Sequence, residues 1–334
     1  MSKQYGVVLI GCGYIGEEHL AQIHYRENVR IIAVVDINEA AAKQLAAKYH
    51  IGEYATDYRK YLGMPEVDIV IIATNVDTHL PIMHACVKAG KHVICEKPVA
   101  NSLESGRAFF DIAQQAEQEG IHVLVGHILR YNRSYQKMKE LIDAGAIGNV
   151  TMFRFVQNHH ALNWKRYQRL LQDCPPVMDC GVHYFDVMQW FSGQKIVHAT
   201  GCGSRLDADS PRDNHYTASL ELSGGCRGSY ESGWSKNLCA FNCKEIIGEK
   251  GYMRFTLQAD RTRDREEGDL IEVYHSDTNS YEIINQPSVY KDMNAQLQEL
   301  IARIEGSGNV EFTLQDAKEA FMVALDIIES NAQP

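Results

Sequence analysis

The chain has 334 residues, of which 45% are hydrophobic and 23% are charged, a composition typical of a globular protein of about two domains. Its 33 basic and 43 acidic residues leave a formal net charge of -10, which argues against binding to nucleic acid or to an anionic membrane surface. No apolar run approaches the roughly 20 residues of a membrane-spanning helix, so we expect a soluble protein.

Short β-branched runs alternate with helical patterns in the first third of the chain. Strands are predicted at residues 7–10, 31–35, 69–72, 92–95 and 123–125, and helices at 40–49, 80–89 and 103–119. Strands that are apolar throughout and separated by helices are typical of a parallel sheet covered on both faces. Residues 1–125 are therefore predicted to form a doubly wound α/β domain.

The pattern changes after about residue 126. Helices are predicted at 135–144 and 182–191 with a strand between them at 150–157, and two more helices at 292–305 and 314–329, the latter capped by Thr313. Strand-like runs follow one another at 196–202, 216–222, 228–234, 245–247, 252–257 and 270–274. Such closely spaced strands favour a large, mostly antiparallel sheet, so residues 126–334 are predicted to form an α+β domain. The charged segment 260–267 is expected to be a solvated loop.

The nine cysteines are an odd number at irregular spacings, which is typical of reduced thiols in the cytoplasm. Two groups have the residue types of a metal site: Cys239 with Cys243, and Cys174 with Cys180 and His183. Neither has a second Cys-x-x-Cys pair to complete a tetrahedral set. We therefore expect no bound metal.

A glycine-rich motif follows the first predicted strand and opens directly into a helical pattern. It consists of Gly11, Cys12, Gly13, Tyr14, Ile15 and Gly16. In a dinucleotide-binding turn the first glycine permits the turn, the second allows the pyrophosphate to approach, and the third allows close packing of helix and strand. Asp36 ends the second strand, 20 residues after Gly16, where a carboxylate binds the adenosine ribose. Asp36 would repel a 2'-phosphate, and the next two residues, Ile37 and Asn38, are not arginines that could bind one. NAD is therefore expected rather than NADP.

Polar residues follow the next two buried strands, at the edge where open α/β sheets bind ligands. Thr74, Asn75 and His79 come after one strand, and Glu96, Lys97 and Pro98 after the other. A partly desolvated lysine there is suited to polarise a substrate hydroxyl or carbonyl, although a strand-end surface lysine has the same pattern. The residues expected to contact the cofactor are Gly11, Gly13, Tyr14, Ile15, Gly16, Asp36, Ile37, Thr74, Asn75, His79, Glu96 and Lys97.

A second group of chemistry-bearing residues begins a later helix. Asp179, Gly181, His183 and Asp186 form a D-x-G-x-H-x-x-D pattern. If the turn is helical, the four-residue spacing puts Asp179 and His183 on one face, where a carboxylate can orient an imidazole. Aspartate is also a good helix N-cap, so, taken alone, such a group is more often structural.

These motifs together resemble the glucose-fructose oxidoreductase, inositol dehydrogenase and rhizopine-catabolism family, called Gfo/Idh/MocA. The resemblance covers nearly the whole chain, through GCGYIG, Asp36, 73–79, Glu-Lys-Pro at 96–98, 126–131 and 179–186. It implies an N-terminal Rossmann domain, a C-terminal open-faced sheet used in oligomerisation, and a substrate held between the two domains. It also implies that Lys97, Asp179 and His183 form the catalytic set.

One segment departs from the family pattern. Many members have a glycine-rich run before the aspartate, where this chain has Asp173, Cys174, Pro175 and Pro176, a stiffer segment that puts the substrate-facing loop in question. Arg130, Tyr131, His159, His160 and Trp164 are candidates to line the substrate pocket. Aromatic and histidine residues also fill ordinary protein interiors, so their role stays open.

The leading hypothesis is an NAD-dependent dehydrogenase acting on a secondary alcohol or ketone of a sugar, an inositol or a related polyol, and forming a homo-oligomer, either a dimer or a tetramer. One alternative is a reductase of a carbon–nitrogen or tetrapyrrole double bond. Another is a non-catalytic NAD-binding sensor, and a third is an enzyme that keeps its cofactor bound through internal redox cycles. Fold and cofactor alone do not identify the substrate.

Overall fold

The computed structural model describes residues 3–256, 269–287, 291–308 and 312–331 and divides into two compact units. The first unit contains Met1–Ile128 and Asp292–Lys318, and the second contains Leu129–Lys291 and Glu319–Pro334. This division differs from the expected boundary after residue 125, because a C-terminal segment returns to the first unit. The predicted loop at 260–267 lies outside the described residues. Within the described part of the chain, no helix has the length and apolar character needed to cross a membrane.

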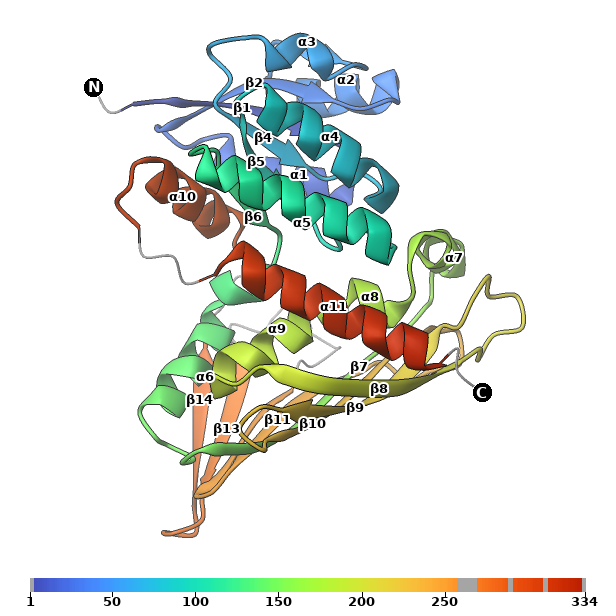
Figure 1. Ribbon diagram of the computed structural model, residues 1–334, viewed down its shortest axis with the longest axis vertical. Coiled ribbons are helices and arrows are strands. Elements are labelled where there is room, and N and C mark those ends of the chain that lie inside the picture. Colours follow the sequence, from blue (N-terminus) through green and yellow to red (C-terminus); the bar gives the residue numbers. More distant parts are fainter. Residues whose placement is uncertain (1–2, 257–268, 288–290, 309–311, 332–334) are drawn as a thin grey trace. The chain divides into compact units, whose positions relative to one another are not determined.

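The first unit is built on a six-stranded parallel sheet with the order β3-β2-β1-β4-β5-β6 (Figure 1). Its strands are β1 (Tyr5–Ile10), β2 (Val29–Val35), β3 (Tyr54–Ala55), β4 (Ile69–Ile72), β5 (His92–Cys95) and β6 (Val123–Val125). Every residue of β1 and β4 is buried, as expected for strands covered on both faces. The strand order reverses between β1 and β4, so the carboxyl ends of these two strands flank the position where doubly wound sheets bind ligands.

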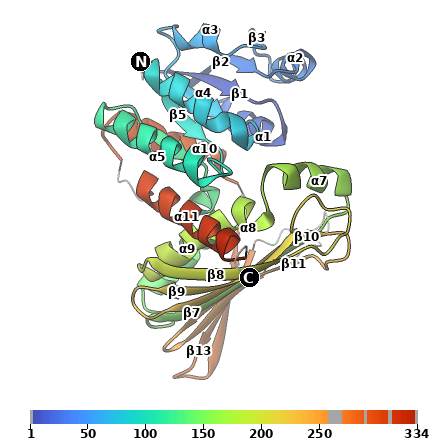
Figure 2. The same ribbon diagram turned by 45° about the vertical axis from the view of Figure 1, so that its right-hand side comes forward.

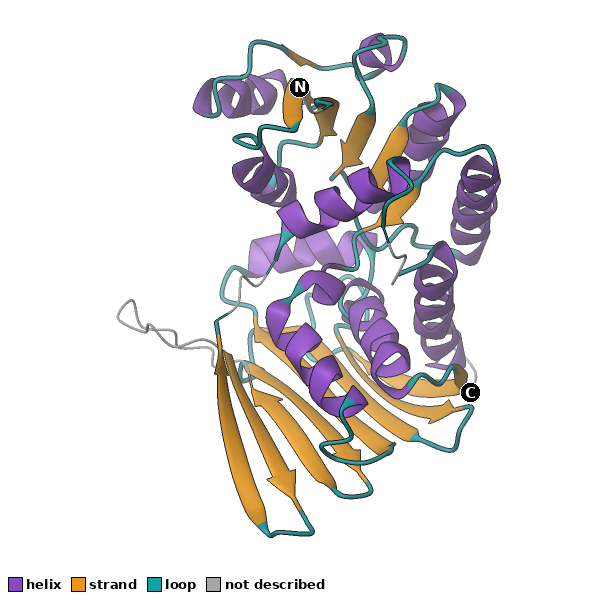
Figure 3. Ribbon diagram, turned by 90° about the vertical axis from the view of Figure 1, so that its left-hand side faces the viewer, coloured by secondary structure: helices purple, strands orange, loops and turns teal. Residues whose placement is uncertain are grey.

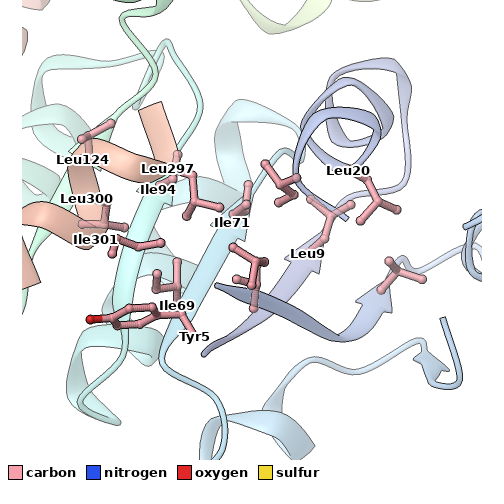
Figure 4. Close-up of a cluster of buried hydrophobic side chains, with 14 of the residues drawn as sticks. Tyr5, Leu9, Leu20, Ile69, Ile71, Ile94, Leu124, Leu297, Leu300 and Ile301 are labelled. Carbon is pink, nitrogen blue, oxygen red and sulfur yellow. The ribbon is translucent and has the colours of Figure 1, made fainter. Parts of the chain in front are cut away.

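Helices cover both faces of this sheet. They are α1 (Tyr14–Ile23), α2 (Glu39–Lys48), α3 (Arg59–Leu62), α4 (Val76–Lys88), α5 (Leu103–Gln118) and α10 (Met293–Ile304), of which α4 and α5 lie side by side (Figures 1 and 2). Leu297, Leu300 and Ile301 of α10 share one buried cluster with Leu9 of β1 and Leu20 of α1 (Figure 4). This packing explains why α10 belongs to the first unit although it follows the second in sequence.

The second unit is built on an eight-stranded sheet with the order β14-β13-β12-β11-β7-β10-β9-β8 (Figure 3). Its strands are β7 (Val150–His160), β8 (Ile196–Ser204), β9 (His215–Leu222), β10 (Arg227–Ser235), β11 (Phe241–Gly248), β12 (Gly251–Thr256), β13 (Asp269–His275) and β14 (Ser280–Gln286). Neighbouring strands are antiparallel except for β7 and β10, which are parallel. The expected fold, a Rossmann sheet followed by a mostly antiparallel one, is confirmed.

The helices of the second unit lie toward one face of its sheet, and in the described chain the opposite face has no helix on it (Figures 1 and 2). They are α6 (Arg133–Asp143), α7 (Trp164–Asp173), α8 (Pro176–Asp179), α9 (Gly181–Ser192) and α11 (Leu314–Asn331), preceded by a 3-10 turn at Ile128–Tyr131. The first five residues of α11 belong to the first unit and the rest to the second. The sheet is therefore open on one side, the arrangement that the family resemblance implies.

Candidate active site

The glycine-rich turn between β1 and α1 has the geometry that its sequence predicts. Gly11 adopts a φ of +101°, and a Cβ there would lie 2.2 Å from the carbonyl oxygen of Ala73. A Cβ on Gly16 would lie 1.9 Å from the carbonyl oxygen of Gly11. Gly13 differs, because its ideal Cβ position has no heavy atom within 4 Å. Gly11 and Gly16 are thus required by the fold, whereas Gly13 leaves open space at the amino end of α1, where a phosphate is favourably bound.

Asp36 follows β2 and is tied to this turn. Its Oδ2 accepts a hydrogen bond from the Cys12 amide at 2.8 Å, and its Oδ1 accepts one from the Asn38 amide at 2.8 Å. Burial and the Asp36 charge raise the pKa of the Cys12 thiol to about 12. The next residue, Ile37, is 95% exposed. An anchored carboxylate beside an exposed apolar residue and an open glycine turn fits the adenosine half of a dinucleotide.

Of the residues expected to contact the cofactor after β4, His79 is buried, whereas Thr74 and Asn75 are at least partly exposed. Asn75 is the N-cap residue of α4, and Thr74 precedes it at the carboxyl end of β4. His79 is buried in α4, with Nε2 3.0 Å from the Thr74 carbonyl oxygen and Nδ1 3.0 Å from the Pro98 carbonyl oxygen. Thr74 and Asn75 therefore lie where the sequence predicts a cofactor contact, while the ring of His79 contacts backbone groups.

Glu96 and Lys97 directly follow β5, as the motif predicts. The Glu96 Oε1 atom lies 2.8 Å from Nε2 of His19, a fully buried residue of α1. Lys97 is half-buried. No pattern in the sequence predicts the contact between His19 and Glu96, because 77 residues separate the two in the chain.

In the second unit, Asp179 and His183 lie on either side of a junction between two helices. Asp179 is the last residue of α8 and His183 lies in the first turn of α9, with Cys180 between them in helical conformation. The Cys180 carbonyl accepts a hydrogen bond from the His183 amide at 3.2 Å. Helical conformation at Cys180 continues the spacing across the junction, so the two half-buried side chains belong to successive turns. Lys97 belongs to the first unit.

The two prolines before Asp179 start α8. Pro175 is the N-cap residue and Pro176 the first helical residue, a position that favours proline because its missing N–H has no helical partner there. The Asp179 amide donates to the Pro175 carbonyl at 3.1 Å. The departure from the family's glycine-rich run is therefore a stiff helix start that sets the position of Asp179.

Asp186, the last residue of the motif, forms an ion pair with Arg130. Both of its carboxylate oxygens accept hydrogen bonds from Arg130, at 2.9 Å from Nε and 2.7 Å from Nη2. The side chains of Arg130 and Asp186 are only 8% and 1% exposed, and the guanidinium lies 4.7 Å from the ring centroid of Trp190. Of the two open roles for Arg130, this pair favours the structural one over a place in the substrate pocket.

Helix α7, which the sequence does not predict, brings further residues toward Asp179. Tyr167 of α7 has its hydroxyl 3.2 Å from Nδ1 of His159, and its ring is edge-on to Trp234 of β10. Burial raises the pKa of Tyr167, and the charge of Asp179 also raises it. Trp164, at the start of α7, donates to Asp209 at 2.9 Å. His159 and Tyr167 thus form a pair near Asp179, while His160 is exposed and Tyr131 is buried.

All nine cysteines are free thiols. Among the residues that the structure describes, no group of three or more His, Cys, Asp or Glu side chains is arranged to hold a metal ion.

Two sequence models of one family match the chain. Residues 5–127 match its oxidoreductase domain, an NAD-binding Rossmann fold, and residues 135–254 match its C-terminal domain. The chain belongs to the Gfo/Idh/MocA family.

Relatives within the Gfo/Idh/MocA family include inositol 2-dehydrogenase 2 of Saccharopolyspora erythraea, 34% identical over 203 residues that cover 60% of this chain and 57% of that protein. Inositol 2-dehydrogenase of Corynebacterium glutamicum is 28% identical over 198 residues, 59% of this chain and 57% of that protein. The match thus spans less than two thirds of the length of these relatives. Scyllo-inositol dehydrogenase from Lactobacillus casei, solved with NAD(H) and scyllo-inositol, shares the fold with a TM-score of 0.78 and 22% identity, covering 98% of this chain and 97% of that one.

Proposed function

We propose that the protein is an NAD-dependent dehydrogenase acting on a secondary alcohol or ketone of a sugar, an inositol or a related polyol. The observation that carries the proposal is the combination, in one chain, of an Asp36-anchored glycine turn, Lys97 directly after β5, and Asp179 with His183 at the junction of α8 and α9. The inositol dehydrogenases among its relatives support this substrate class.

The catalytic roles follow from the chemistry of each side chain. Bound NAD supplies an acceptor for the hydride that leaves the substrate carbon. His183 takes the hydroxyl proton as general base and returns it when the reaction runs toward the alcohol. Asp179 orients the His183 ring, and the ammonium group of Lys97 stabilises the alkoxide character that develops on the substrate oxygen.

The cofactor is assigned to the residues around the glycine turn. The first-turn amides of α1, at Tyr14 and Ile15, would bind the pyrophosphate beside Gly13, whose ideal Cβ position has no heavy atom within 4 Å. Asp36 would accept hydrogen bonds from the ribose diol, with Ile37 as an apolar surface beside it. Thr74, Asn75, Glu96 and Lys97 complete the proposed set at the ends of β4 and β5, and the buried His79 is given a different role below.

A substrate screen tests this function. Purified protein is assayed for NADH formation with a panel of inositols, aldoses and their phosphates, and His183→Ala serves as the matched inactive control. We expect the wild type to turn over at least one polyol and the variant to turn over none. NAD binding without turnover of any polyol or of the corresponding ketones would support the sensor alternative, and protein that already absorbs as NADH on purification would support a retained cofactor.

We also propose that the protein forms a homo-oligomer through the open face of the second sheet. Tyr252, Tyr274 and Tyr281 are neighbours across β12, β13 and β14 on one face, in tilted ring contacts with centroid distances of 5.4 and 4.9 Å. Strand alternation places Ile283, 69% exposed, on the same face of β14 as Tyr281, which is 62% exposed. This exposed group of aromatic and aliphatic side chains favours a second copy as its partner.

The oligomer is tested by light scattering on purified protein. Ile283→Asp should lower the particle mass toward that of one chain, because a charge would have to be buried in the interface. Tyr25→Asp is the matched control, since Tyr25 is 63% exposed in the first unit and should leave the mass unchanged. A monomeric wild type would contradict this part of the proposal.

A cytoplasmic location is proposed on the basis of the cysteines. All nine are free thiols, and Cys202 and Cys239 are exposed, which is typical of a reducing compartment. Fractionation of cells that express the tagged protein should recover it with cytoplasmic markers.

A further inference from the structure

Two buried histidines contact the residues on either side of Lys97. His19 of α1 has no exposed surface and lies 2.8 Å, through Nε2, from the carboxylate of Glu96. His79 of α4 is 2% exposed and lies 3.0 Å, through Nδ1, from the carbonyl oxygen of Pro98. The tripeptide Glu96-Lys97-Pro98 is thus contacted at both ends by imidazoles from different helices.

The Glu96 side chain is confined on more than one side. His19 lies in the helix that begins at the glycine turn, so its contact connects that helix to the end of β5. A Cβ on Gly126 would lie 2.8 Å from Oε2 of Glu96, so the backbone after β6 packs closely against the same carboxylate. A side chain at position 126 would displace the carboxylate. These close neighbours restrict the conformations of the Glu96 side chain. Because Glu96 precedes Lys97, they also restrict the backbone next to Lys97.

The contact made by His79 joins two strand ends. Its Nε2 lies 3.0 Å from the carbonyl oxygen of Thr74, after β4, while its Nδ1 faces Pro98, after β5. Both partners are carbonyl oxygens and can only accept, so the ring donates to one of them when neutral and to both when protonated. Burial lowers the pKa of His79, and the two carbonyl contacts raise it. Burial is the larger effect, so the pKa of His79 is lowered overall, and the neutral ring donates to one of the two carbonyl oxygens while it packs against the other.

We propose that His19 and His79 are positioning residues for Lys97, fixing Glu96 and Pro98 and thereby the backbone from which the lysine side chain extends. This inference rests on the proposed function, because it requires Lys97 to act on the substrate oxygen. Lysine has a long side chain with four rotatable bonds, so the site depends on a well-fixed Cα position. Misplacement of a catalytic group by about 1 Å can lower the rate about a hundredfold.

The first experiment compares apolar and hydrogen-bonding replacements. His19→Leu and His79→Leu should each lower kcat about tenfold or more, while the Kd for NAD changes by less than about threefold. His19→Gln and His79→Gln keep one side-chain donor and should recover most of the turnover. Turnover is expressed per folded molecule, and melting temperatures are measured on the same preparations.

The matched control is His92, which begins β5 at the opposite end of the strand from Lys97. It is half-buried, and its Nδ1 accepts a hydrogen bond from the His122 amide at 3.0 Å. His92→Leu should lower the melting temperature and leave kcat unchanged. An equal loss of kcat in His92→Leu would show that general loosening of the unit causes the effect, and would overturn the inference.

A second readout reports on Lys97 without turnover. Each protein is treated briefly with an amine-acetylating reagent, and the rate of modification of the Lys97 peptide is followed by mass spectrometry. This rate should change in both leucine variants, return toward the wild-type value in the glutamine variants and stay unchanged in His92→Leu. If a leucine variant does not fold, the alanine variant at the same position, which also removes the hydrogen-bonding ring, is measured in its place with the same expected losses.

A double substitution separates this inference from the proposed function. If His19 and His79 act through Lys97, adding His79→Leu to Lys97→Ala should cause no further loss of kcat. Additive losses would overturn the positioning role. Near-normal turnover of Lys97→Ala alone would instead overturn the proposed function. A large loss in Lys97→Ala, with wild-type turnover and labelling rate in both leucine variants, would overturn the positioning inference alone.

Discussion

The two units of this protein carry their chemistry in different ways. In the first unit the backbone is central: Gly11 and Gly16 permit contacts that a Cβ would prevent, and Gly13 leaves the amino end of α1 open. In the second unit the proposed chemistry lies in side chains of common types, and Asp179 and Asp186 occur seven residues apart in one motif with different surroundings. Where the backbone must adopt a special conformation, the sequence shows it as a glycine. The role of a side chain depends on which residues lie near it in space, and the sequence does not show these.

The largest expected effect concerns the two aspartates of the second unit. Asp186→Ala leaves the buried Arg130 guanidinium without its bidentate partner, and breaking such a pair typically costs about 3–5 kcal/mol in the free energy of unfolding. Asp179→Ala, at a half-buried position, should cost about 1 kcal/mol or less and instead reduce turnover. Urea unfolding of both variants measures the difference. Equal stability losses would remove the distinction drawn between these two residues.

The next effect is catalytic and involves both units. His183→Ala and Lys97→Ala should each lower kcat about a hundredfold or more, the usual scale for one acid–base or electrostatic group. The Kd for NAD should change little, because neither change alters the glycine turn. Steady-state kinetics and NAD titration on the same preparations test this. Near-normal turnover of folded His183→Ala would contradict the proposed mechanism.

A smaller effect is expected for cofactor choice in the first unit. Asp36→Ala should narrow the preference for NAD over NADP by about tenfold, because it removes a charge-assisted hydrogen bond to the ribose and a repulsive charge toward a 2'-phosphate. Fluorescence titration with both reduced cofactors measures the ratio. Asp68→Ala is the control, since the Asp68 carboxylate accepts from the Gly6 amide at the amino end of the sheet and should not affect the ratio. Equal or tighter binding of NADP by the wild type would contradict the assignment.

The smallest effect is a pH dependence of stability at the amino end of β5. Burial, with a contribution from His122, lowers the pKa of His92 from 6.5 to about 4. The unfolded chain therefore binds more protons than the folded protein between these values, so the contribution of His92 to stability is complete above about pH 6.5 and is lost as the pH falls toward 4. His92→Gln should weaken the decline in urea stability between pH 7 and pH 5. An identical decline in both proteins would show that other groups cause it.

The sequence predicts the fold best where burial is complete. Strands β4, β5 and β6 were predicted to the residue, because each is a short apolar run between breaks in the pattern. Helix α7 and strand β14 were missed. In α7 the apolar residues Trp164, Tyr167, Leu170 and Leu171 recur at helical spacing, but the helix is short and otherwise polar. Most of β14 is exposed, so its strand pattern is weak. The two-residue β3 is too short to leave a pattern. For α10 the sequence predicts an amphipathic helix but not the sheet against which it packs.

Some residues of the candidate site can also be predicted from the sequence, and others cannot. The glycine turn and Asp36 follow from the residues themselves, and the structure has them in contact through the Cys12 amide. Lys97, Asp179 and His183 were candidates from their positions and residue types, and the family resemblance joined them into one catalytic set; that shared role stays a prediction. His19 and Tyr167 had no signal at all, because each gains its significance from a partner that only folding brings near.

The return of α10 to the first unit has a consequence for synthesis on the ribosome. Residues 129–291, 163 in all, must be translated between the end of the first segment of this unit and the start of α10. At about 5–20 residues per second, this takes on the order of 8–30 s. During that interval the nascent first unit lacks the side chains of Leu297, Leu300 and Ile301 that complete its core. The sheet that carries the glycine turn thus gains the packing of α10 only after the intervening residues have been made, and until then part of its apolar face is uncovered.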